Sequence, residues 1–225
     1  MKVERLEVTG AVAFLVAAAL FAALAWGVES RTFIVSADLE ATRWTLSHRW
    51  AALTWLMLGI SALNSPGMVS VWAVCFGVVL LRRGERYWFV TLALAVGGGM
   101  LLNEGLKLLF RRARPELDDP LVIVHSFSFP SGHTAAATVL YGVLAAYLVY
   151  FTRTPRGRVA VIAAAVALVA LVGLSRVYLG AHYPSDVLAA ACSSTVWLIL
   201  CLVGVHRLVQ RRSALDRRDG GAGRG

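Results

Sequence analysis

Long apolar runs without charged residues alternate with short polar segments along most of the chain. A helix that crosses the hydrocarbon core of a bilayer needs about 20 predominantly apolar residues. The pattern therefore predicts an all-α fold, a polytopic membrane bundle of six transmembrane helices. The predicted spans are 10–28, 66–81, 87–110, 134–151, 159–174 and 187–205.

Two segments between the first spans depart from this simple alternation. Residues 29–49 mix both charges with Arg, Trp and His, which predicts a loop with an interfacial helical segment after the first span. Residues 50–81 lack charge, but Asn64-Ser65-Pro66-Gly67 interrupts them, and each half reaches only about 21 Å as helix, against a core of about 30 Å. We expect the first half to lie against the bundle and the second to be a short span. Two short spans are the alternative.

The ends of the chain have distinct compositions. Residues 10–26 could form the apolar part of a secretory signal with the cleavage-like triplet Ala23-Leu24-Ala25, but their length and the preceding Glu4 and Glu7 favour a retained span. No repeat or linker divides residues 1–210, which we expect to form a single domain. Residues 211–225, basic and then rich in glycine, predict a disordered cytoplasmic tail.

Composition and charge narrow the class of partner. The chain is 58% hydrophobic and 16% charged, with a net charge of +9. In a soluble protein this charge would suggest nucleic acid, but here the cations lie in short loops and the tail, so anionic lipid headgroups and phosphate are the expected partners and nucleic acid is not. Cys75, Cys192 and Cys201 fall inside apolar runs without CxxC spacing, which argues against disulfides and a zinc site.

The distribution of lysine and arginine predicts the orientation in the membrane. With six spans, 14 of the 22 lysines and arginines fall on the side of the two chain ends and the turns near 82–86 and 153–158. The richer side is normally cytoplasmic. The poorer side nevertheless concentrates five cations close to two histidine-containing segments, which indicates a function for them: Lys107, Arg111, Arg112, Arg114 and Arg176.

Three short segments on this poorer side carry ionisable groups near the ends of predicted spans. In order, they contain Lys107, Arg114 and Pro115, then Pro130-Ser131-Gly132-His133, then Ser175, Arg176, His182 and Asp186. Each has an ordinary structural explanation: cations at a span end can reach the interface, Ser131 can cap a helix, and His182 can pair with Asp186. Together, three cations, two histidines and a carboxylate near a membrane indicate a functional site.

The residue types in these segments suit a phosphate group. Arg114 and Arg176 offer guanidinium forks, and Lys107 offers a point charge. If the helix persists, Lys107 and Arg114 share a face two turns apart, whereas Pro115 favours an opened last turn that lets Arg114 turn inward. The start of the helix at 131–133 offers free backbone N–H groups, and its glycine allows close approach of an oxyanion.

The spacing of the two histidines predicts different roles. Pro184 fits the first position of the last helix, so Asp186 lies in its first turn and can reach back to His182. That contact would fix the tautomer and leave the other ring nitrogen free to attack phosphorus. His133 has no acidic residue at such spacing, and its helix start faces the bound phosphate. We therefore expect His182 to be the nucleophile and His133 the general acid.

The three motifs KxxxxxxRP, PSGH and SRxxxxxHxxxD, in this order over residues 107–186, resemble the signature of the type-2 phosphatidic acid phosphatase family. That superfamily includes the vanadium haloperoxidases, and the six spans resemble its bacterial membrane members of the phosphatidylglycerophosphatase B type. The resemblance implies a phosphatase without metal or other cofactor that works through a phosphohistidine, with catalytic His182, Asp186 and His133. It also implies that the phosphate is bound by Lys107, Arg114, Ser131, Gly132 and Arg176.

The expected function is hydrolysis of a phosphorylated membrane lipid on the outer face of the cytoplasmic membrane. Candidate substrates are polyprenyl diphosphate, phosphatidylglycerophosphate and phosphatidate. The alternative is a non-catalytic lipid-binding or transport protein that retains a phosphate site, although transporters more often place ionisable groups near mid-membrane. Glu116, Asp118 and Asp119 could suggest a metal site, but we interpret them as a solvated acidic loop. Arg111 and Arg112 could form a second phosphate site or could anchor lipid headgroups, and both interpretations stay open.

Overall fold

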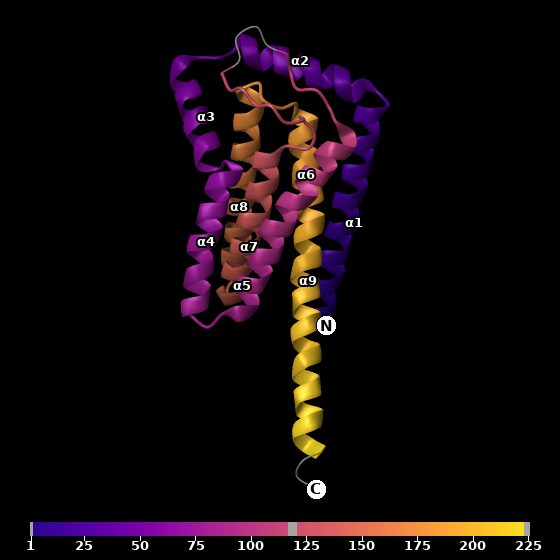
Figure 1. Cartoon of the computed structure of the whole chain (residues 1–225), viewed down its shortest axis with the longest axis vertical. Coiled ribbons are helices and arrows are strands. Elements are labelled where there is room, and N and C mark those ends of the chain that lie inside the picture. The colour runs from indigo at the N-terminus through magenta and orange to yellow at the C-terminus, as the bar shows by residue number, and fades with distance from the viewer. Residues whose placement is uncertain (1, 117–120, 223–225) are drawn as a thin grey trace.

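The structure, a computed structural model, describes residues 2–116 and 121–222, and the side chains of residues 8–116 and 121–210. All its regular elements in these ranges are helices, which run roughly along one bundle axis apart from α2 (Figure 1). The helices are α1 (Lys2–Glu29), α2 (Phe33–Ser47), α3 (Ala51–Leu63), α4 (Pro66–Arg82), α5 (Arg86–Ala93), the π-helical turn η1 (Leu94–Gly98), α6 (Gly99–Phe110), α7 (Gly132–Phe151), α8 (Pro155–Tyr178) and α9 (Pro184–Ala222).

The predicted all-α membrane bundle is confirmed. Five helical stretches of the described residues are long and apolar enough to cross a membrane, and the pair α3 and α4 raises the number to six if it is one bent span. These two helices meet at an angle of 52° and follow each other along the bundle in Figure 1. The first half does lie against the bundle as expected, since Leu53 and Met57 of α3 pack with Leu179.

The break between α3 and α4 is built from the sequence that predicted it. Pro66 occupies the first turn of α4, and Ser65 caps that helix by accepting the N–H of Met68 at 3.3 Å. Tyr141 of α7 donates to the side-chain oxygen of Asn64 at 2.6 Å. Polar groups freed at a break inside a membrane must find partners in the protein, so Tyr141 fixes the bend against the bundle.

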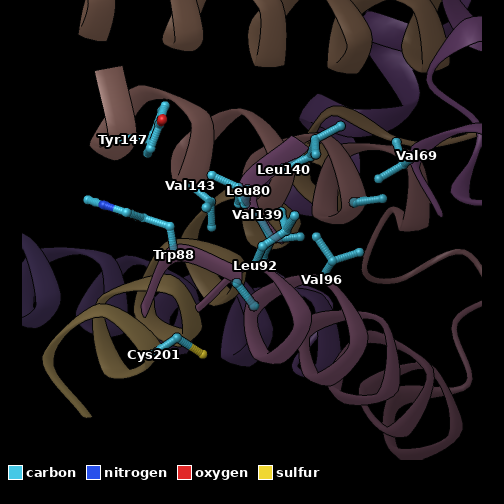
Figure 2. Packing of buried hydrophobic residues seen from close by; sticks show 12 residues of the cluster. Val69, Leu80, Trp88, Leu92, Val96, Val139, Leu140, Val143, Tyr147 and Cys201 are labelled. Atoms are coloured by element: carbon cyan, nitrogen blue, oxygen red, sulfur yellow. The ribbon is translucent and has the colours of Figure 1, made fainter. Parts of the chain in front are cut away.

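α7 is the central helix of the bundle. Half of the residues in its apolar window are buried, against 11% for α8, which faces outward. Figure 2 shows Val139 and Val143 of α7 facing Leu80 of α4 and Leu92 of α5 in the main apolar cluster. Because α7 is held on several sides, its N-terminus is a fixed point around which a site can be built.

The two ends of the bundle differ in what they carry. α2 lies across one end, together with the segments 111–116, 121–131 and 179–183, and we call this the α2 end (Figure 1). The N-terminus, the turn between α4 and α5 and the C-terminal helix lie toward the opposite end. The helix predicted after the first span is therefore present as α2. The loops of the α2 end and the turn between α4 and α5 lie at opposite ends of the bundle, as the predicted topology requires.

Two helices extend further than the apolar pattern predicted. The polar link expected at 175–183 is wrong in its first part, since α8 continues to Tyr178 and carries Ser175 and Arg176 in its last turn. α9 continues to Ala222 where a disordered tail from residue 211 was expected, and residues 223–225 lie outside the described part of the chain. In the extension of α9, arginine, leucine and alanine favour helix even where hydropathy falls.

Candidate active site

The three predicted segments meet at the α2 end of the bundle. The last turn of α6, the first turn of α7, the last turn of α8 and the start of α9 surround the site, and the segments 111–116 and 121–131 lie beside them (Figure 1). Lys107, His133, Arg176 and Asp186 are thus held at helix ends, where backbone N–H or C=O groups become available, and Arg114 and His182 lie in the connecting segments.

Lys107 and Arg114 reach the site from different kinds of backbone. Lys107 is buried in α6, with Nζ 2.7 Å from an exposed carboxylate oxygen of Glu104. α6 ends at Phe110, and Arg111 takes a left-handed conformation with φ 45°. The two cations therefore do not share a helical face. The opened last turn that Pro115 favoured is what the structure shows.

Arg114 turns inward and is fixed by the segments around it. Its Nη1 donates to the carbonyl oxygen of Ala181 at 2.6 Å and lies 3.1 Å from Nε2 of His182. Its Nε donates to the carbonyl oxygen of Ser126 at 2.7 Å. The guanidinium therefore stands directly in front of the ring nitrogen that would attack phosphorus.

Arg176 is a buried cation with hydrogen-bonding capacity left over. Its side chain is 1% exposed, and one terminal nitrogen donates to the hydroxyl of Ser61 on α3. Its Nε has no hydrogen-bond partner among the described residues. A buried donor left unsatisfied costs about 1–3 kcal/mol, and more when it is charged, so the position favours an anionic ligand.

The start of α7 keeps its amide groups uncapped. Ser131 occupies the cap position, but its side chain accepts no N–H of the helix, so its ordinary role as a helix cap is not observed. Its hydroxyl accepts a hydrogen bond from Thr134 at 3.2 Å, and its backbone N–H donates to the Asp186 carbonyl at 3.1 Å. A Cβ at Gly132 would lie 3.3 Å from Nζ of Lys107, so the glycine lets this cation approach the helix N-terminus.

Asp186 reaches His182 as the spacing predicted. α9 begins at Pro184, and Oδ2 of Asp186 lies 3.5 Å from Nδ1 of His182. The same oxygen accepts the hydroxyl of Ser128 at 2.5 Å and the N–H of Tyr183 at 2.9 Å. Both residues of the pair are buried. A carboxylate held by several donors orients the imidazole firmly.

The neighbours of His182 determine its tautomer and its charge. Arginine has donors only, so Nε2, which faces Arg114, must be the acceptor, and Nδ1 carries the proton that faces Asp186. Burial lowers the pKa of His182 from 6.5 to about 4, although Asp186 raises it, and Arg114 and Arg176 lower it further. The imidazole is therefore neutral near pH 7, with its free lone pair on Nε2.

His133 lies in the first turn of α7 among positive groups. The ionisable groups that interact with it are the cations Arg176, Lys107 and Arg114 and the imidazole of His182, with no carboxylate among them. This agrees with the sequence, in which no acidic residue follows His133 at the spacing of His182 and Asp186. All eight residues expected at the site thus belong to one assembly at the α2 end.

Several residues of the site could not be identified from the motifs. They are Ser128, which bonds to Asp186, Ser61, which bonds to Arg176, and the group Asp38, Arg112 and Ser185 behind Asp186. Arg112 and Ser185 are next to motif residues, which is a weak signal. Ser61 and Asp38 lie in other helices and have no local signature.

Comparison with known proteins shows the family of the chain. Residues 87–210, more than half of the chain, match the model of the PAP2 superfamily. Phosphatidylglycerophosphatase B of Bacillus subtilis (strain 168) is 35% identical over 69% of this chain and 76% of its own length. Decaprenylphosphoryl-5-phosphoribose phosphatase of Mycobacterium tuberculosis (strain CDC 1551 / Oshkosh) is 34% identical over 60% of this chain and 72% of its own.

A solved structure extends the similarity to nearly the whole bundle. The crystal structure of a transmembrane PAP2-type phosphatidylglycerolphosphate phosphatase from Bacillus subtilis matches with a TM-score of 0.70 and 29% identity. The match covers 90% of this chain and 96% of the other. The resemblance to the bacterial membrane members, drawn from three motifs, is confirmed. The chain belongs to the PAP2 superfamily and is a membrane-spanning lipid phosphatase.

Proposed function

We propose that the enzyme removes phosphate from a membrane lipid through a phosphohistidine on His182, at the extracytoplasmic surface of the cytoplasmic membrane. The observation that carries this proposal is the neutral, buried imidazole of His182, with a carboxylate at Nδ1 and a guanidinium at Nε2. A nucleophile that is oriented from behind and faces cations in front suits attack on an anionic phosphorus centre.

The reaction would run in two steps. Nε2 of His182 forms a bond to phosphorus while the bond to the leaving oxygen breaks, and His133 gives that oxygen its proton. Water then attacks phosphorus, the bond to Nε2 breaks, and His133 takes the proton of the water. Lys107, Arg114 and Arg176 would bind the equatorial phosphate oxygens, where negative charge gathers in the transition state.

Three phosphorylated lipids are candidates for the substrate. The names of the similar proteins refer to phosphatidylglycerophosphate and to a decaprenylphosphoryl phosphoribose. For this chain we keep polyprenyl diphosphate, phosphatidylglycerophosphate and phosphatidate as candidates. Arg112 donates to two carboxylates, which speaks against its use as a ligand for a second phosphate and favours a phosphomonoester.

The purified protein in detergent should release inorganic phosphate from at least one of these three lipids with EDTA present. The proposed catalytic groups are imidazoles and cations of the chain, so chelation should leave the rate unchanged. Vanadate, which adopts the five-coordinate geometry of the transition state, should inhibit competitively. Activity that disappears with EDTA and returns with magnesium would contradict the mechanism, and no release from any of the three would contradict the substrate class.

The orientation is supported by the charge distribution. In the sequence, the segments assigned to the α2 side contain eight of the 22 lysines and arginines, and the segments assigned to the other side contain 14. The positive-inside rule then assigns the α2 end to the extracytoplasmic side.

In a variant whose three native cysteines are replaced by serine, a cysteine at His125 should react with a membrane-impermeant thiol reagent in intact cells. A cysteine at Arg156 should react only after the cells are lysed. Both positions are exposed, so the difference reports the side of the membrane. Labelling of Arg156→Cys alone in intact cells would reverse the proposed orientation.

A further inference from the structure

A cluster of polar and charged side chains lies behind the nucleophile, and apart from Asp186 it has no part in the two proposed steps. It consists of Asp38 from α2, Arg112 from the segment after α6, and Ser185 and Asp186 from the start of α9, and we call it the carboxylate cluster. Its two carboxylates are 3% and 0% exposed, and the Arg112 side chain is 11% exposed. Burial of two acids with one base requires a specific pattern of hydrogen bonds.

Arg112 joins the two carboxylates through separate nitrogens. Its Nη1 donates to Oδ1 of Asp186 at 2.6 Å, and its Nη2 donates to Oδ2 of Asp38 at 2.7 Å. The guanidinium also stacks over the ring of Tyr183, with its carbon 4.3 Å from the ring centroid. With two ion pairs and a ring holding it, Arg112 cannot turn toward a substrate without leaving buried carboxylates unpaired.

Asp38 is bonded to the same helix start that carries Asp186. Its Oδ1 accepts the N–H of Ser185 at 2.9 Å, and its Oδ2 accepts the Ser185 hydroxyl at 2.5 Å. Residues 147 positions apart in the chain are thereby joined. Asp38 lies on α2, which crosses the end of the bundle above the site (Figure 1).

The charges of the cluster do not cancel. The single positive charge of Arg112 faces two carboxylates, which leaves one negative charge over. Because Asp38 already opposes Arg112, the charge of Asp186 stays available to Nδ1 of His182. When Nε2 bonds to phosphorus, the imidazole ring becomes cationic, and an ionised Asp186 beside it stabilises that state.

We propose that Asp38 is a positioning residue which, through Arg112, holds Asp186 in place and preserves its negative charge for the phosphorylated form of His182. This inference rests on the proposed phosphohistidine mechanism. It gives Arg112 a role other than the second phosphate site or the headgroup anchor, and it joins α2 to the chemistry of the site.

The other ionisable groups that face His182 make the sign of the effect clear. Arg114 comes from the segment after α6, Arg176 from α8 and His133 from α7, and Lys107 of α6 interacts in turn with His133. All of these are cations or imidazoles. Asp186 is therefore the carboxylate that opposes them, and the net charge behind it should govern the pKa of His182.

Two charge-neutralising variants should move the pH dependence of phosphohistidine formation in opposite directions. In Asp38→Asn the positive charge of Arg112 acts on Asp186 alone, so the pKa of His182 falls. The acidic limb of the pH–rate profile, which reports protonation of His182, then moves to lower pH. In Arg112→Gln the surplus negative charge grows and the limb moves to higher pH. Each variant should lower kcat about tenfold, a size typical of residues that act within one hydrogen-bond network. The KM of each variant should stay within about twofold of the wild-type KM. The double variant should return the limb toward that of the wild type.

Matched controls separate this effect from general loss of charge. Glu40→Gln removes an exposed carboxylate and Arg43→Gln removes an exposed guanidinium, both from the same helix as Asp38. Both should keep the wild-type kcat and pH limb. Asp38→Glu, which keeps the charge, should keep the wild-type limb, and Arg112→Gln tests the predicted shift by itself if Asp38→Asn does not fold.

Failure of the phosphohistidine mechanism and failure of the proposed role of Asp38 would give different experimental results. Rapid quenching of the wild type with radiolabelled substrate should trap a base-stable, acid-labile phosphohistidine, and its absence would overturn the mechanism. If the phosphohistidine forms but the two variants shift the limb in the same direction, or match their controls, the role of Asp38 is overturned.

Discussion

His182→Ala should abolish turnover of every lipid phosphate. The variant lacks the atom that bonds to phosphorus, and the remaining cations bind phosphate without offering another nucleophile at that position. Loss of a nucleophile that acts as a unit with its orienting partners lowers kcat on the order of 10⁴-fold or more. Phosphate release in detergent, with radiolabelled substrate to detect the phosphoenzyme, measures both the rate and the intermediate.

The matched control for this variant is His125→Ala, an exposed histidine on the segment between α6 and α7. It should retain the wild-type rate. If His182→Ala formed a phosphoenzyme or retained more than a trace of activity while remaining folded, another residue would have to be the nucleophile.

His133→Ala should slow the reaction by an amount that depends on the leaving group. A positioned general acid contributes about 10²–10⁴-fold when the leaving oxygen is a poor one, such as the alkoxide of phosphatidate. A phosphate leaving group, with a second pKa of about 6, is a stable anion near neutral pH and needs the proton less. The loss should therefore be largest for phosphatidate, smaller for polyprenyl diphosphate and smallest for an aryl phosphate.

The three substrates can be compared in one detergent system, so that each ratio of variant to wild type is free of differences in solubilisation. The deciding measurement is how this ratio of variant rate to wild-type rate differs between the three substrates. Equal slowing of all three substrates by His133→Ala, combined with measurable turnover by His182→Ala, would show that the roles of the two histidines are assigned wrongly.

Much of the fold was predictable because the bilayer imposes a simple rule on the sequence. Helices that cross it must be apolar over about 20 residues, so hydropathy located the five uninterrupted spans to within a few residues. The pair α3 and α4 was harder, since neither half satisfies that length and the bend of 52° joins them. Its outcome depended on packing against α7 and α8.

Hydropathy failed where helices continue beyond the apolar region. Arg176 lies in the last helical turn of α8, although its polarity predicted a link. A helix can extend past the membrane core as long as its backbone hydrogen bonds are satisfied, and at the α2 end the protein itself surrounds it. The helix end that carries Arg176 is thus more regular than the sequence indicated, whereas the helix starts that carry His133 and Asp186 were predicted.

By itself, the sequence determined the membrane bundle, the three motifs and the assembly of eight residues suited to phosphate. Short-range rules sufficed for these, since span length, helix starts at proline and the four-residue spacing of His182 and Asp186 are local. Only the tertiary structure decided what stands behind them. Ser61 bonds to Arg176 across 115 positions and Asp38 bonds to Arg112 across 74. Such contacts form where separate helices pack together, so no local pattern in the chain encodes them.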